Sequence, residues 1–267
     1  MAIKHPEFPA SAYVGNATLI QPCLGARLYE DDYGSILFGA PPEVLKGLLL
    51  HGIGNFDTVV LPDVREKGGS LTNSLEFPLY FFLFVSKGLE QGRKLNLVGN
   101  EDALSQTLRL LRITLLGPTR EELSNWRTEP ELIDEWLAAS DELALKDKAG
   151  EILQVQDFFN LCPFRDGTAK VGGHLITRQA TDVFEIDAKG SITTIDLNED
   201  AVLVPPYQVQ PDYVPGGLTK MGIEVLGGAS GFTPSEPCTG LALCYNGEYI
   251  LIDCIPFLDE HLFARGI

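Results

Sequence analysis

Short apolar runs alternate with longer helical patterns over the first hundred residues, and this alternation is the strongest constraint on the fold. Residues 17–20, 26–29 and 35–38 are predicted strands, and a proline-led helix is predicted over residues 42–50. Residues 58–61 read Thr-Val-Val-Leu, as expected of a strand buried on both faces. Strands that alternate with helices in this way predict a layered α/β fold.

Charge and cysteine content exclude several classes of protein. The formal net charge is −17, from 20 Lys and Arg against 37 Asp and Glu, which disfavours binding to nucleic acid or to anionic membranes. The five cysteines contain no Cys-x-x-Cys pair, so neither a disulfide framework nor a cysteine-rich zinc site is expected. The first nine residues lack the apolar core of a secretory signal, and a cytoplasmic location is therefore predicted.

The composition divides the chain into two predicted parts. Residues 1–210 are expected to form one domain, in which the charged stretch 118–149 is a helical insertion and residues 173–204 are an antiparallel meander. Residues 211–267 are expected to hold a linker, a strand, an Asn246-Gly247 hairpin and a short helix.

Two segments of the chain correspond at a constant offset of 214 residues. Ile36-Leu37-Phe38 aligns with Ile250-Leu251-Ile252, Pro42 with Pro256, and Gly52-Ile53 with Gly266-Ile267. Both segments read as a strand, a proline-led turn, a short helix and Gly-Ile, which suggests a duplication. In the first segment the Gly-Ile pair leads directly into the apolar strand at residues 58–61.

These segments resemble the opening of a metallo-β-lactamase-superfamily domain. Residues 223–231, Ile-Glu-Val-Leu-Gly-Gly-Ala-Ser-Gly, resemble the first strand and glycine loop of the phosphodiesterase and tRNA-processing-nuclease branch. Residues 249–254 resemble its strand that ends in an aspartate, here Asp253. The resemblance implies an αββα sandwich over residues 1–210, followed by the opening segment of a second, similar domain within residues 211–267.

The first domain departs from the family at its metal-binding motif. Active members carry T-H-x-H-x-D-H after the apolar strand, because imidazole and carboxylate ligands must converge on the metal. Here Asp63 and Arg65 stand at the leading histidines, Lys67 at the aspartate and Gly68 at the final histidine. Two cations at these positions are hard to reconcile with metal-dependent hydrolysis.

Several candidate site residues follow from this alignment. Gly172-Gly173-His174 resembles a later family element and Asp196 its bridging aspartate, so Asp63, His174 and Asp196 are the candidate ligands of a reduced site for zinc, iron or manganese. Arg65 and Lys67 are the candidate ligands of an anion. The competing interpretation is that His174 caps a strand and Asp196 ends one. The acid pairs Asp31-Asp32 and Glu199-Asp200 are expected to lie in solvated turns, and no catalytic residue is assigned.

The leading hypothesis is a non-catalytic metallo-β-lactamase-like domain that scaffolds, binds a ligand or dimerises, and that holds no cofactor. It would precede a catalytic domain of which residues 221–267 are the beginning, with Ile267 as a truncation point, or it would pair as a homodimer through an unfinished sheet edge. The first alternative is a metal-dependent hydrolase of phosphoesters. The second alternative is a small-molecule sensor in which Arg65 and Lys67 hold the anion.

Overall fold

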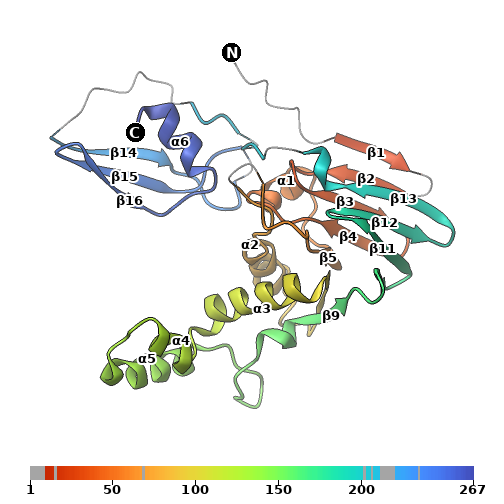
Figure 1. Cartoon of the computed structure of the whole chain (residues 1–267), viewed down its shortest axis with the longest axis horizontal. Helices are drawn as coiled ribbons and strands as arrows, with labels where there is room; N and C mark the ends of the chain where they lie inside the picture. Colours follow the sequence, from red (N-terminus) through yellow and green to blue (C-terminus); the bar gives the residue numbers. More distant parts are fainter. Residues whose placement is uncertain are drawn as a thin grey trace.

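The computed structural model describes residues 10–14, 17–67, 70–200, 203–205, 207–210, 220–233 and 235–267. Within these residues a seven-stranded sheet runs through the main body (Figure 1). Its first four strands are antiparallel neighbours, and its last four are parallel. In spatial order the strands are β1 (Ala10–Val14), β2 (Ala17–Gln21), β3 (Arg27–Asp31), β4 (Gly34–Phe38), β5 (Thr58–Val60), β8 (Leu95–Gly99) and β9 (Phe159–Pro163).

A second sheet packs on one face of the first. It is an antiparallel meander of β10 (Thr168–Val171), β11 (His174–Ala180), β12 (Val183–Ala188) and β13 (Ser191–Asp196). Alternate side chains of the two sheets form one core, in which Ile36 and Phe38 meet Phe184 and Ile186. Burying each of these large side chains contributes about 1.5–3 kcal/mol, so this interface fixes how the sheets are oriented.

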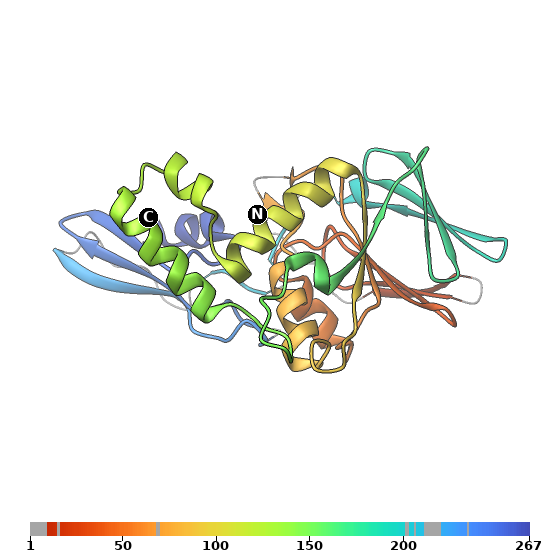
Figure 2. The same cartoon turned by 90° about the horizontal axis from the view of Figure 1, so that it is seen from below.

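Helices cover the opposite face of the seven-stranded sheet (Figure 2). They are α1 (Val44–Leu50), α2 (Glu76–Tyr80) with the π-helical turn η1 (Phe81–Val85), α3 (Glu101–Leu116) and the 3₁₀ turn η2 (Val155–Phe158). Val59 faces the helix side and Val60 the sheet side, and both are fully buried. The predicted doubly buried strand is therefore confirmed, as is the α/β class. Among the described residues, helices line one outer face of the sandwich, and the outer face of β10–β13 carries none.

The predicted helical insertion is a pair of helices, α4 (Arg120–Asn125) and α5 (Pro130–Leu143). Thr119 caps α4, with its hydroxyl accepting from the amide of Glu122 while the Glu122 carboxylate accepts from the amide of Thr119. Trp126 and Trp136 remain about half exposed. The pair extends beyond the end of α3 instead of lying over the sheet (Figure 1).

The C-terminal residues form a separate three-stranded sheet with one helix. β14 (Met221–Gly227), β15 (Gly240–Tyr245) and β16 (Glu248–Ile252) are antiparallel, and α6 (Leu258–Arg265) packs on one face around Leu226, Ala242 and Ile255. The predicted Asn246-Gly247 hairpin is present, with positive φ at both residues. Much of the predicted linker, residues 206 and 211–219, lies outside the described residues, as does Gly68. No described helix is long and apolar enough to cross a membrane.

The two segments related by the 214-residue offset have the same backbone course. Each has a residue with left-handed φ just after its strand, another immediately before its helix and a third at the helix end. These are Gly39 (74°) and Asp253 (57°), Glu43 (68°) and Phe257 (58°), and Gly52 (73°) and Gly266 (71°). Positive φ is uncommon outside glycine, so its recurrence at three equivalent positions is a specific match. The amides of Ile53 and Ile267 also close their helices alike, each 3.0 Å from the carbonyl oxygen five residues before it.

The two segments differ in what covers them. In the first, β4 lies between β3 and β5, and the second sheet buries Ile36 and Phe38 to 2% and 0% exposure. In the second, β16 is an edge strand of the described sheet, and the equivalent residues Ile250 and Ile252 are 61% and 45% exposed. The second segment is therefore built like the first but lacks, among the described residues, the strand and the sheet that complete it.

Candidate functional site

Asp63 lies in the loop that follows β5, where the two sheets meet, and both of its carboxylate oxygens accept hydrogen bonds. Oδ2 accepts from Nε of Arg178 at 2.7 Å and from the backbone amide of Asp182 at 3.0 Å. Oδ1 accepts from Nδ2 of Asn100 at 2.8 Å, and Asn100 in turn caps the start of α3. With only 7% of its side chain exposed, Asp63 connects three separate elements.

Asp182 completes a reciprocal pair with Asp63. It occupies the turn between β11 and β12 with φ of 56°, and it is fully buried. Its Oδ1 accepts from the backbone amide of Asp63 at 2.5 Å and from that of Val64 at 3.3 Å. Burial raises the pKa of Asp182, and the nearby charge of Asp63 raises it further. Its second oxygen, Oδ2, has no hydrogen-bond partner among the described residues.

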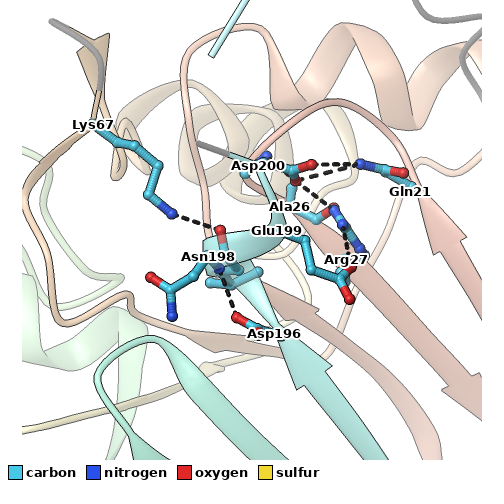
Figure 3. A network of polar contacts seen from close by, with 10 residues as sticks. Gln21, Ala26, Arg27, Lys67, Asp196, Asn198, Glu199 and Asp200 are labelled. Carbon is cyan, nitrogen blue, oxygen red and sulfur yellow. Dashed lines mark hydrogen bonds and ion pairs between the residues drawn. The ribbon is translucent and has the colours of Figure 1, made fainter. Parts of the chain in front are cut away.

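The predicted anion ligands lie in the same loop. Lys67, in the short strand β6 (Glu66–Lys67) that pairs with β7 (Ser70–Leu71), donates from Nζ to the carbonyl oxygen of Leu197 at 2.5 Å (Figure 3). Arg65 is exposed, and its carbonyl oxygen accepts from the amide of Thr72. Lys67 thus holds the turn after β13 in place, while Arg65 faces solvent. Binding of an anion by the two remains a prediction.

Asp196 is a strand-end residue. Its Oδ1 accepts from the amide of Asn198 at 2.8 Å and caps the 3₁₀ turn η3 (Leu197–Glu199) (Figure 3). It pairs in register with Val183, next to Asp182, so it lies at the same end of the meander as Asp63. Its carboxylate does not contact Asp63 in the described hydrogen bonds.

His174 lies at the other end of the sandwich. It is the first residue of β11, whereas Asp182 follows the last residue of that seven-residue strand. At about 3.3 Å per residue the two ends of the strand are about 20 Å apart. The imidazole Nε2 lies 3.0 Å from both carboxylate oxygens of Asp31, and Tyr29 and Tyr33 contact the ring edge-on. The structure therefore does not bring His174 together with Asp63 and Asp196, because the length of β11 separates them.

The residues at the Asp63 loop do not fit zinc, iron or manganese. A metal needs free carboxylate or imidazole lone pairs and an open position for water, but both oxygens of Asp63 face N–H donors, one of them a guanidinium. Among the described residues no group of three His, Cys, Asp or Glu side chains could hold a metal ion. The charges here are arranged to hold protein elements together.

Two acid pairs were expected to lie in solvated turns, but only one residue of each pair is exposed to solvent. Asp31 is buried against His174. Asp200 accepts from Arg27 and from the backbone amide of Gly25, each at 2.7 Å, and so attaches the segment after β13 to the turn before β3 (Figure 3). Glu199, by contrast, is 68% exposed. The prediction is wrong for Asp31 and Asp200, because their partners lie far away in the sequence.

A second polar cluster joins the main body to the C-terminal sheet. Lys46 on α1 is fully buried, with Nζ 3.1 Å from Oε2 of Glu43, and it also donates to the carbonyl of Glu236. Tyr207 donates to Oε1 of Glu43 at 3.1 Å, and its ring lies between Lys46 and His261 of α6. This cluster was not predicted from the sequence, where only the Glu43–Lys46 spacing hinted at an ion pair.

The pKa shifts of Tyr207, Cys238 and His261 keep these three groups neutral around the Glu43–Lys46 ion pair. Burial, followed by the charge of Glu43, raises the pKa of Tyr207 and of Cys238. Burial, followed by the positive charge of Arg265, lowers the pKa of His261 to about 4, so its imidazole is neutral at pH 7. The ion pair lies within the first turn of α1, and the cluster joins α1 to the C-terminal residues through the bond from Lys46 to the Glu236 carbonyl and through the Tyr207 ring.

Solved structures similar to this chain include the metallo-beta-lactamase fold protein YhfI from Bacillus subtilis and MEM-A1, a subclass B3 metallo-beta-lactamase from a soil metagenome library. For YhfI the identity is 12% and the TM-score 0.37, over 72% of this chain and 56% of that one. For MEM-A1 the values are 11% and 0.35, over 71% and 61%. The chain thus spans less than two thirds of either structure. No family model and no curated protein sequence matches it.

Proposed function

We propose that residues 1–210 form a non-catalytic metallo-β-lactamase-like domain that serves as a scaffold. The observation that carries this proposal is the state of Asp63, which stands where the family's metal-binding motif begins. Its carboxylate is occupied by Arg178, Asn100 and the amide of Asp182. An aspartate so engaged supports the sheet junction, and because both of its oxygens already accept from protein N–H groups, it is poorly suited to bind a metal or to activate water.

We further propose that residues 221–267 open a second domain of the same kind. Support comes from the three equivalent positions of positive φ and from the exposed side chains on β16. In the first of the two repeated segments, the parallel strand β5 and the sheet β10–β13 cover the corresponding surface of β4. The second of the two repeated segments also carries Asp253 at the position of Gly39. The resemblance implies an aspartate at this position.

The first experiment is an assay of hydrolysis. The chain is incubated with bis(p-nitrophenyl) phosphate in the presence of Zn²⁺, Mn²⁺ or Fe²⁺, and we expect no turnover above that of the metal alone. Turnover that disappears in Asp63→Asn would contradict the non-catalytic assignment.

The second experiment concerns residues 221–267 and is independent of the first. β4 lies between two strands, whereas β16 is an edge strand of the described sheet. We therefore expect amide hydrogen exchange, measured by mass spectrometry, to be faster in β16 than in β4. Equally slow exchange in the two strands would contradict this half of the proposal without affecting the assignment of residues 1–210.

A further inference from the structure

A cavity of about 950 Å³ lies between the two repeated turns. One wall is the turn that leads into α1, and the opposite wall is the equivalent turn between β16 and α6. The remaining wall comes from α2 and its neighbourhood. Most of the surface is apolar, contributed chiefly by Pro41, Leu45, Phe77, Pro78, Ile255 and Phe257. Its volume falls within the range of cavities that bind small molecules.

The charged groups of this cavity are predominantly acidic. Among the described residues that line it are four carboxylates, those of Glu43, Glu76, Asp253 and Asp259, and one ammonium, that of Lys46. Lys46 and Glu43 neutralise one another. The described wall of the cavity therefore keeps three carboxylates that no lining cation neutralises, and their field favours a cation over an anion.

Glu76 is the carboxylate best placed to select a ligand. It lies half-buried in the first turn of α2, beside the exposed ring of Phe77, and no described cation pairs with it. Burial in these apolar surroundings raises the pKa of Glu76. A cation bound beside it would reverse that effect, because an opposite charge within a few ångströms favours the ionised carboxylate.

We propose that this cavity binds a small apolar molecule that carries one ammonium group. The apolar body lies against the proline and phenylalanine walls, and the ammonium pairs with Glu76. This site is separate from the Asp63 loop, and it stands whether or not the domain is catalytic.

The test measures thermal stabilisation of the full 267-residue chain by n-octylamine, with sodium octanoate as the probe of opposite charge, both below the micellar range. We expect octylamine to raise Tm in a saturable manner and octanoate to have no effect. Glu76→Gln should weaken octylamine binding about tenfold, as expected for the loss of one half-buried ion pair. Glu248→Gln, an exposed carboxylate outside the cavity, is the matched control and should leave binding unchanged.

A cavity-filling variant tests whether octylamine binds in this cavity. Cys254 is exposed and lines the cavity, so Cys254→Trp should fill part of it and reduce octylamine binding without unfolding the protein. Equal stabilisation by octylamine and octanoate, or equal binding by the Glu76→Gln and Glu248→Gln variants, would overturn the proposal. Unchanged binding in Cys254→Trp would overturn it as well, because the amine would then bind elsewhere.

Discussion

Arg178 on β11 donates from Nε to Oδ2 of Asp63 in the loop after β5, at 2.7 Å. This bond joins the two sheets of the sandwich at the place where the resemblance implies a metal-binding motif. A cation of the protein itself is thus paired with this carboxylate. The consequences of this arrangement can be measured.

Loss of Arg178 should weaken the sheet junction. In Arg178→Met the carboxylate of Asp63 loses its counter-charge while it remains buried beside Asp182, and we expect a destabilisation of about 1–2 kcal/mol, since the guanidinium is partly exposed. Urea unfolding followed by circular dichroism measures this. Arg165→Met removes an exposed pair with Glu101 and should change the stability by less than about 0.5 kcal/mol. Equal effects of the two variants would count against the role assigned to Asp63.

Asp182 should make part of the stability depend on pH. Because burial raises its pKa in the folded state, the folded protein holds this proton more tightly than the unfolded chain does. Its contribution is fully present below the unfolded pKa of about 4 and is lost as pH rises through the raised folded value. Asp182→Asn keeps an oxygen to accept from the Asp63 amide but cannot ionise. The difference in unfolding free energy between variant and wild type should therefore grow from pH 4 to pH 7 in favour of the variant. A difference that is constant with pH would refute this.

The buried pair of Lys46 and Glu43 should hold the C-terminal unit against α1. Lys46→Met leaves Glu43 buried without its counter-charge, which costs about 3–5 kcal/mol when a pair is fully buried. We expect faster amide hydrogen exchange in α6 and β15, measured by mass spectrometry. Lys87→Met, which alters an exposed pair with Glu90, serves as the control and should leave exchange in these elements unchanged. Slow exchange of α6 in Lys46→Met would show that other contacts hold the unit in place.

The uncovered face of the C-terminal sheet should promote association between copies of this 267-residue chain. Met221, Ile223, Val225 and Ile250 project from one face and are each more than half exposed. Apolar patches of this kind on soluble proteins mark interfaces. We expect concentration-dependent association in sedimentation velocity, reduced by the double variant Ile223→Lys and Ile250→Lys. Thr194→Lys on the polar outer face of β13 is the control, and a monomer at all concentrations would refute the prediction.

Local patterns predicted the elements of this fold well, because each depends on nearby residues. The strand at residues 58–61 was evident from its apolar run, and the hairpin at Asn246-Gly247 from the need for positive φ at both residues. The repeat at an offset of 214 residues was visible as a few identities and proved to extend to backbone conformation.

Local sequence patterns could not predict the polar clusters, because the residues in each cluster are far apart in the sequence. His174 and Asp31 are 143 residues apart, Asp63 and Asp182 are 119 apart, and Tyr207 and Glu43 are 164 apart. Alignment to a family motif selected Asp63 as a candidate metal ligand, and the structure places it at a junction of elements. It also suggested that His174 belonged with Asp63, although β11 carries the two to opposite ends of the sandwich.

We propose that the carboxylate of Asp63 holds elements of the protein together and does not bind a metal ion. The most direct test is elemental analysis of the chain purified without chelator and dialysed against Zn²⁺, Mn²⁺ or Fe²⁺, beside Asp63→Asn and His174→Ala. The structure predicts less than about 0.1 equivalent of metal in all three proteins. Close to one equivalent in the wild type, lost in Asp63→Asn, would contradict it.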